Sequence, residues 1–137
     1  MQKVWWKIIG AALVVYTTIA GLLLEVPHLD ILNESIRNLY FHVPMWFSMI
    51  ILFSISVFYS IKYLSKPDEI YDLKAVEAVN AGIIFGVLGL LTGAVWAKFT
   101  WGQYWSSDPK QNFAAIAMLL YFCLLYTSDA ADEEDSV

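Results

Sequence analysis

The chain has 137 residues, of which 59% are hydrophobic and only 15% charged, and its mean hydropathy is +0.59. This composition is typical of a membrane protein and excludes an ordinary water-soluble domain. The formal net charge of -5 arises at the C-terminus, where five of the 13 acidic residues lie within the last nine positions. The remaining acids balance the 8 Lys and Arg residues, so we expect no nucleic-acid partner, because such a partner requires a basic surface.

Four apolar segments follow one another along the chain, and each predicts a membrane-spanning helix. They cover residues 8–24, 43–61 and 76–97, and the fourth begins at residue 113 and is still apolar at residue 126. Segments of about 17–25 residues match the bilayer thickness, and in lipid a helix satisfies its own backbone hydrogen bonds. We predict an all-α, polytopic transmembrane helix bundle with three complete spans plus a truncated fourth. A signal peptide is the alternative for the first segment, although no clear cleavage site follows it.

The distribution of Lys and Arg predicts the orientation of these spans, because cytoplasmic loops carry an excess of positive charge. The N-terminus and residues 62–74 hold five of the eight basic residues, so we expect both to be cytoplasmic. Residues 25–41 and 98–112 are then on the outer, periplasmic face. The cytoplasmic five are Lys3, Lys7, Lys62, Lys66 and Lys74, and the outer three are Arg37, Lys98 and Lys110.

A histidine and a proline mark the entrance to the second span. Residues 40–44 have the sequence Tyr-Phe-His-Val-Pro, and because proline suits the first turn of a helix, we expect the helix to start at Pro44. His42 then lies at the outer face, where a neutral imidazole is an effective ligand for haem iron. The alternative is an ordinary interface histidine that only forms hydrogen bonds.

Four glycines recur in the third span at spacings of 4, 3 and 4, which places them on one face of a helix. Such a face lets another helix approach closely. We expect it to pack against a neighbouring span of the same chain, and contact with a partner membrane subunit is the alternative. The glycines are Gly82, Gly86, Gly89 and Gly93.

The outer loop between the third and fourth spans, residues 101–110, is rich in aromatic side chains and has the sequence WGQYWSSDPK. Trp and Tyr gather at membrane interfaces, which is one explanation for the loop. With Trp96, however, it provides four rings within ten residues. A flat π surface of this kind suits a flat, largely apolar ligand, because stacking adds to the burial of area.

The charged end of this loop has both a structural and a functional interpretation. Asp108 followed by Pro109 predicts the N-cap and the first position of the fourth helix. Lys98 and Lys110 flank the loop. They either mark helix ends near lipid headgroups or pair with the carboxylates of a bound ligand.

The C-terminal segment does not continue the pattern of the spans. Residues 123–133 have the sequence CLLYTSDAADE, which matches the translation of a common transposon-type sequencing adapter. We therefore expect a transmembrane domain of residues 1–122, as the N-terminal part of a longer protein, followed by a non-native segment of residues 123–137. The alternative is a genuine, disordered acidic tail.

These segments resemble the haem-handling membrane proteins of cytochrome c maturation. WGQYWSSDPK is similar to the tryptophan-rich WWD signature, whose common form is WGxxWxWDxR/K, and Tyr-Phe-His-Val-Pro resembles the histidine motif of the haem exporter protein C family. The resemblance covers nearly all of residues 1–122. One departure is Ser107, which stands where the family has a tryptophan, so the aromatic surface lacks one ring.

The resemblance implies that haem b is bound transiently, as cargo. By position, Trp101, Tyr104 and Trp105 would contact the haem and His42 would be one axial ligand of its iron. The second histidine of the family lies beyond this sequence. The complete expected site consists of Trp101, Gly102, Tyr104, Trp105, Asp108 and Lys110 for the cofactor and His42 for the metal.

The expected function is therefore to hold haem at the outer face of the bacterial cytoplasmic (inner) membrane and to deliver it for c-type cytochrome assembly. The resemblance also implies ATP-binding cassette subunits and a periplasmic haem chaperone or acceptor as partners, in addition to the lipid bilayer. No catalytic dyad, nucleophile or phosphate loop is evident in the sequence, so we do not expect an enzyme. The alternatives are a cytochrome c haem lyase of the related WWD family and a structural permease subunit.

Overall fold

The computed structural model describes residues 4–30 and 32–135, with side chains described as far as residue 127. No strand occurs within those ranges, and the predicted all-α fold is confirmed. The elements are α1 (Trp5–Leu23), the 3-10 helix η1 (Asn33–Asn38), α2 (Leu39–Ser65), α3 (Glu69–Trp101) and α4 (Pro109–Asp135).

Among the described residues, three helical segments are long and apolar enough to cross a membrane, namely α1, residues 33–65 formed by η1 and α2, and α3. The prediction of three complete spans agrees with them in length and composition. The fourth helix, α4, continues to Asp135, so the backbone of the acidic residues that follow its apolar part is also helical. The proposed foreign origin of residues 123–137 stays a prediction.

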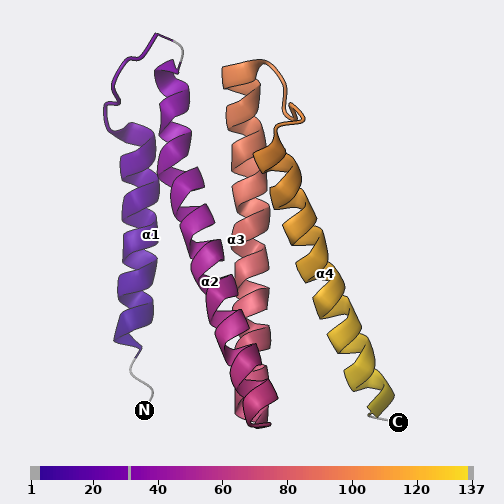
Figure 1. Cartoon of the computed structure of the whole chain (residues 1–137). Coiled ribbons are helices and arrows are strands. Elements are labelled where there is room, and N and C mark those ends of the chain that lie inside the picture. The colour runs from indigo at the N-terminus through magenta and orange to yellow at the C-terminus, as the bar shows by residue number, and fades with distance from the viewer. Residues whose placement is uncertain (1–3, 31, 136–137) are drawn as a thin grey trace.

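The four long helices lie side by side and alternate in direction (Figure 1). The connection from α1 to α2 and the connection from α3 to α4 therefore lie at the same end of the bundle, and the short α2–α3 turn lies at the other end. This alternation places His42 and the loop of residues 102–108 at one common end, which we call the loop end. The side of the membrane that the loop end faces stays a prediction from the charges.

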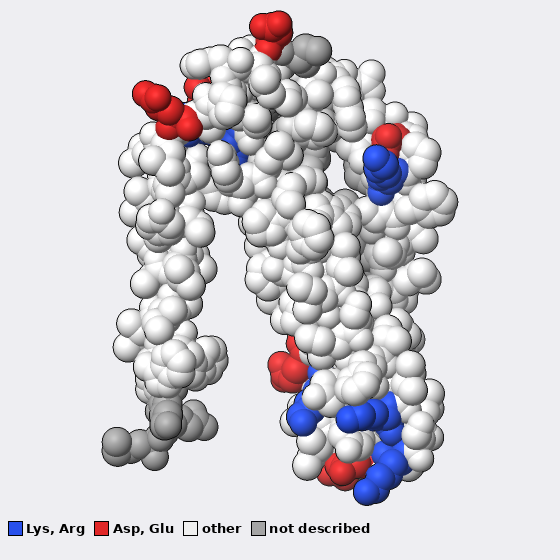
Figure 2. Space-filling view, turned by 60° about the vertical axis from the view of Figure 1, so that its left-hand side comes forward, with Lys and Arg blue, Asp and Glu red and all other residues white. Residues whose placement is uncertain are grey.

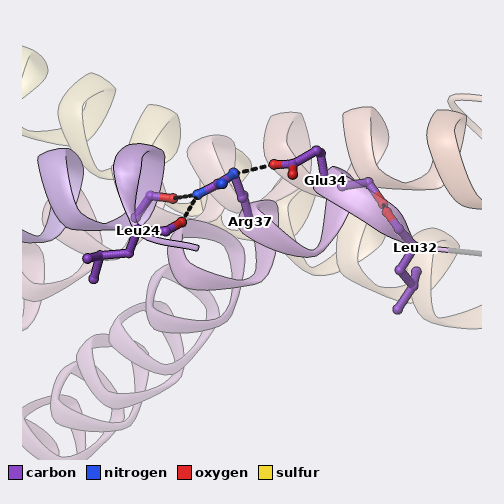
Figure 3. Close-up of polar contacts among 6 residues, drawn as sticks. Leu24, Leu32, Glu34 and Arg37 are labelled. Carbon is purple, nitrogen blue, oxygen red and sulfur yellow. Dashed lines mark hydrogen bonds and ion pairs between the residues drawn. The ribbon is translucent and has the colours of Figure 1, made fainter. Parts of the chain in front are cut away.

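The helix α1 stands apart from the other helices except near its C-terminus, and Figure 2 shows the open space beside it. Within α1 only Gly21 is buried, because the ring of Phe41 lies 2.9 Å from the position that a Cβ of Gly21 would occupy. Arg37 joins the two segments (Figure 3): its Nη1 donates to the carbonyls of Gly21 and Leu24, and its Nε donates to Glu34 at 2.5 Å. The Arg37 side chain thus donates hydrogen bonds to carbonyls at the C-terminal end of α1, where a helix leaves its carbonyls without backbone donors.

The ends of α3 and α4 follow rules that are visible in the sequence. The carboxylate of Asp68 accepts a hydrogen bond from the backbone N–H of Ile70 at the start of α3. At the other end, Gly102 takes a left-handed φ of 79°, which glycine adopts without steric cost. In α4 the carboxylate of Asp108 accepts from the N–H of Lys110 at 2.8 Å, directly before Pro109. The predicted N-cap of the fourth helix is confirmed.

The predicted start of the second helix at Pro44 is wrong. The helix begins at Leu39, directly after η1, and Pro44 lies inside it. The backbone of Asn38 already has helical angles, so the chain passes from the 3-10 helix into α2 without an extended residue between them. Pro44 has no N–H, so the carbonyl of Tyr40 loses its usual helical donor. His42 is therefore held in a helical turn, not in the loop before it.

The four glycines of α3 face α2, which is the predicted packing within the chain. Large α2 side chains, joined at Gly86 by Met118 of α4, occupy the space that a Cβ at each glycine would fill, and the α2 atoms approach to between 2.5 and 3.4 Å. The face is therefore covered by α2, with Met118 of α4 over Gly86, and is not free for a partner subunit, as the alternative required. The four contacts are Gly82 with Phe53, Gly86 with Met49, Gly89 with Trp46 and Gly93 with His42.

Candidate functional site

A cavity of ≈ 670 Å³ lies at the loop end, between α2, α3, the first turns of α4 and the loop that joins the last two helices. Its volume falls within the range of about 300–1,000 Å³ that is usual for small-molecule and cofactor sites. Aromatic and apolar side chains form most of its wall. The lining residues used below are His42, Trp46, Gly89, Gly93, Trp96, Trp101, Trp105, Asp108, Lys110 and Gln111.

His42 is attached to α3 through one ring nitrogen. Its Nδ1 lies 3.1 Å from the carbonyl oxygen of Gly89 and 3.1 Å from Oγ1 of Thr92. A carbonyl oxygen only accepts hydrogen bonds, so the contact with Gly89 requires a proton on Nδ1. The neutral imidazole then keeps a lone pair on Nε2, which is the arrangement of a histidine that binds a metal through Nε2.

The imidazole ring fits against α3 because the facing residues have no side chain. A Cβ at Gly93 would lie 2.7 Å from Cε1 of His42, far inside ordinary van der Waals contact. Trp46, one turn further along α2, lies edge to face with the imidazole, with ring centroids 6.0 Å apart and an interplanar angle of 73°. The glycines therefore determine how closely His42 approaches α3.

Three indole rings from α3 and the loop form the aromatic wall. Trp96 and Trp101 meet edge to face at 5.5 Å between centroids and 71° between planes. Trp105 lies further along the loop, and its indole N–H donates to Oδ1 of Asn112 at 3.1 Å. Trp101 and Trp105 remain 50% and 44% exposed, so both offer ring area that a ligand could cover.

The first turns of α4 hold the aromatic loop in place. Oε1 of Gln111 accepts hydrogen bonds from the backbone N–H and the hydroxyl of Ser106, at 3.0 and 3.1 Å. The amide of Asn112 donates to the carbonyl of Ser107 in addition to accepting from Trp105. Two adjacent amide side chains thus replace the backbone pairing that an irregular loop lacks.

Ser107 has a positive φ of 54°. This left-handed conformation is uncommon for residues with a Cβ and is usually adopted by glycine. Its side chain is exposed, so in this loop the position does not add to the aromatic wall.

Five of the seven residues predicted for the site line the cavity together, namely His42, Trp101, Trp105, Asp108 and Lys110. The other two, Gly102 and Tyr104, are absent from its lining. Gly102 ends α3, and Tyr104 is 60% exposed, with Nζ of Lys98 5.5 Å from its ring centroid. Lys98 also donates to the carbonyl of Gly102 at 2.9 Å and so stabilises the end of α3.

Several residues that shape the site were not assigned to it from the sequence. Thr92 and Gly89 hold His42, Trp46 packs on its ring, and Gln111 and Asn112 hold the loop. The spacing of His42 and Trp46, four residues apart on one face, was the available signal for the Trp46 contact. Among the residues that the structure describes, no group of three or more His, Cys, Asp or Glu could hold a metal ion.

The comparisons with known proteins agree on one family. The family described as Cytochrome C assembly protein matches residues 3–134. Over 78 residues, 56% of the chain, the sequence is 37% identical to the cytochrome c biogenesis protein CcsA of Trachelium caeruleum, of which it covers 25%. The CcsA of Chlorella vulgaris is 43% identical over 56 residues, which are 41% of this chain and 18% of that protein.

A cyanobacterial relative gives the same picture. The CcsA of Synechococcus sp. (strain CC9311) is 38% identical over 60 residues, which are 44% of this chain and 20% of that protein. The chain thus spans a quarter or less of the length of these relatives. No solved structure matches the chain significantly.

Proposed function

The chain belongs to the cytochrome C assembly protein family, and we propose that it binds haem at the loop end of its bundle and delivers it for the assembly of c-type cytochromes. One observation carries the proposal. His42, protonated at Nδ1 and with a lone pair on Nε2, lines the same cavity as four tryptophan rings. A single imidazole is sufficient here, because haem brings the other four nitrogen ligands of its iron.

The chemistry of the lining fits a haem molecule. His42 would bind the iron through Nε2, and the exposed faces of Trp101 and Trp105 would cover the macrocycle. Lys110 also lines the cavity and is suited to pair with a propionate carboxylate. We propose that the same end of the bundle faces the periplasm, as the distribution of basic residues indicates.

The wider setting is part of the proposal. We place the chain in the bacterial cytoplasmic membrane, with haem b as transient cargo, ATP-binding cassette subunits beside it and a periplasmic chaperone or acceptor that takes the haem. The names of the relatives support the part of this proposal that concerns cytochrome c assembly, because each is a cytochrome c biogenesis protein.

The test compares loss of the ligand with loss of ring area. The chain is purified in detergent, loaded with ferric haem and followed by the Soret absorbance. We expect His42→Ala to lose haem and to regain it when imidazole is added, since the small base fills the space of the missing ring. Trp101→Ala should also bind haem poorly, but imidazole should restore little, because it cannot replace an indole. His28→Ala, at an exposed position, is the control and should load like the parent chain.

Full loading of His42→Ala with an unchanged spectrum would overturn the proposal. The same preparation distinguishes delivery from a haem lyase, the alternative from the sequence. Haem transferred to a peptide with a C-x-x-C-H motif is recovered free after denaturation in the first case and covalently attached in the second.

A further inference from the structure

We propose that Thr92 is a positioning residue for His42, and that with the carbonyl of Gly89 it fixes which ring nitrogen is available to a ligand. Both oxygens lie 3.1 Å from Nδ1 of the imidazole. The consequence for a metal ligand rests on the haem-binding function proposed above. The position of the proton, however, is a property of the chain that can be measured without haem.

The direction of the hydrogen bond between Thr92 and His42 follows from the other contacts of the Thr92 hydroxyl. Its hydroxyl has one proton, and Oγ1 lies 2.8 Å from the carbonyl of Leu88 and 3.1 Å from that of Gly89, both of which can only accept. A proton donated to Leu88 leaves the lone pairs of Oγ1 free to accept from His42. The imidazole nitrogen therefore faces two acceptors, and both stabilise the tautomer that carries its proton on Nδ1.

The turn that carries Thr92 is itself held from α2. The side-chain amide of Asn38 donates to the carbonyl of Thr92 at 2.7 Å. Asn38 and His42 are four residues apart, so they lie on one face of the continuous helical segment formed by η1 and α2. Two side chains of that face thus bond to one turn of α3, residues 89–92, which fixes the turn against the ring.

The ring has little freedom to choose another position. Gly93 leaves room for the imidazole but not for a Cβ as well, and Trp46 lies edge to face with the ring. With the ring confined on these sides, the acceptors at Nδ1 decide between the two tautomers. A hydrogen bond of this kind behind a metal-binding histidine raises the basicity of the other nitrogen and typically changes metal affinity by about 10–100-fold.

The experiment removes the hydroxyl and keeps the shape. Thr92→Val replaces the hydroxyl with a methyl group, and Thr92→Ser keeps the hydroxyl. Thr100→Val is the matched control, because Thr100 lies two turns further along α3 and its Oγ1 has no partner among the described residues. All variants are made in a His28→Gln background, so that ¹⁵N NMR of labelled histidine reports His42 alone. Circular dichroism verifies that each variant is folded.

The first measurement is made on the haem-free protein. We expect a protonated Nδ1 and a bare Nε2 in the parent, in Thr92→Ser and in Thr100→Val. In Thr92→Val the carbonyl of Gly89 remains as one acceptor, so we expect the averaged ¹⁵N shifts of Nδ1 and Nε2 to move part of the way toward each other. The second measurement is the Kd for ferric haem, which should rise about 10-fold in Thr92→Val and stay unchanged in Thr100→Val.

The outcomes separate the two proposals. A tautomer and a haem Kd that are both unchanged in Thr92→Val would overturn the role of Thr92 while leaving haem binding intact. A tautomer that shifts in Thr92→Val, in a protein whose haem binding does not depend on His42, would support the hydrogen-bond arrangement and refute the proposed function.

Discussion

Replacing Gly93 with alanine tests whether the approach of α2 to α3 sets the position of the candidate ligand. The added Cβ would lie 2.7 Å from Cε1 of His42, whereas carbon atoms in contact lie about 3.5–4.0 Å apart. The imidazole must therefore move by about 1 Å, which is enough to break its 3.1 Å hydrogen bonds to Gly89 and Thr92. Overpacking of this size costs about 1–3 kcal/mol, and a lost hydrogen bond costs about 0.5–1.5 kcal/mol.

The assay is a haem titration of the purified variant, with thermal unfolding in detergent measured in parallel. We expect weaker haem binding, a changed Soret maximum and a lower Tm. Gly10→Ala is the control, because nothing lies within 4 Å of a Cβ at Gly10 on the exposed helix α1. Alanine there should be neutral or stabilising by about 0.5–1 kcal/mol. If Gly93→Ala bound haem with the parental affinity and spectrum, the close approach of α3 would not position His42.

Three further predictions follow from other parts of the structure. Asp108→Ala removes the N-cap of α4 and should destabilise the protein by about 0.5–2 kcal/mol, measured by thermal unfolding, while Asp108→Asn should restore most of the loss. Asn112→Leu removes the acceptor of the Trp105 indole N–H. With the other tryptophans replaced by Phe, we expect acrylamide to quench the fluorescence of Trp105 faster in this variant. An unchanged quenching rate would contradict the role of Asn112. In a Cys123→Ser background, a cysteine at Ser106 should react with a membrane-impermeant maleimide in intact cells, and a cysteine at Ser65 should not. The reason is that the loop end is expected to be periplasmic. The opposite labelling pattern would reverse the orientation.

The features that local rules govern were predictable from the sequence. Asp108 and Pro109 predicted the start of α4, and the spacing of the α3 glycines predicted a close helix contact. Both features depend on residues that are near one another along a single element. The helix start predicted at Pro44 was wrong, because α2 begins at Leu39. The continuity of η1 with α2 lets the helix begin earlier and carry the proline inside, and no local signal showed this.

The contacts between segments could not be predicted in the same way. The hydrogen bond from His42 to Thr92 depends on how far α2 is shifted along α3, and the periodicity of each helix leaves that shift undetermined. Within the aromatic loop the backbone has no regular period, so the sequence could not tell that Trp105 lines the cavity and that Tyr104 does not. Side-chain amides of α4 determine the loop conformation, and Gln and Asn carry no distinctive signal for such a role.

The large α2 side chains and the α3 glycines also define the depth of the site. Residues 42, 46, 49 and 53 advance by 4, 3 and 4 positions, and the opposing glycines advance by the same steps in the reverse direction. If α2 were shifted by one helical turn along α3, a three-residue step on one helix would face a four-residue step on the other. Large side chains of α2 would then meet α3 residues that carry a Cβ. The pairing therefore admits one longitudinal register. From Gly82 to Gly93 it extends over about 16 Å, at a rise of about 1.5 Å per residue. Gly82 does not line the cavity, yet a bulky residue there would push Phe53 and α2, and the same helix carries His42.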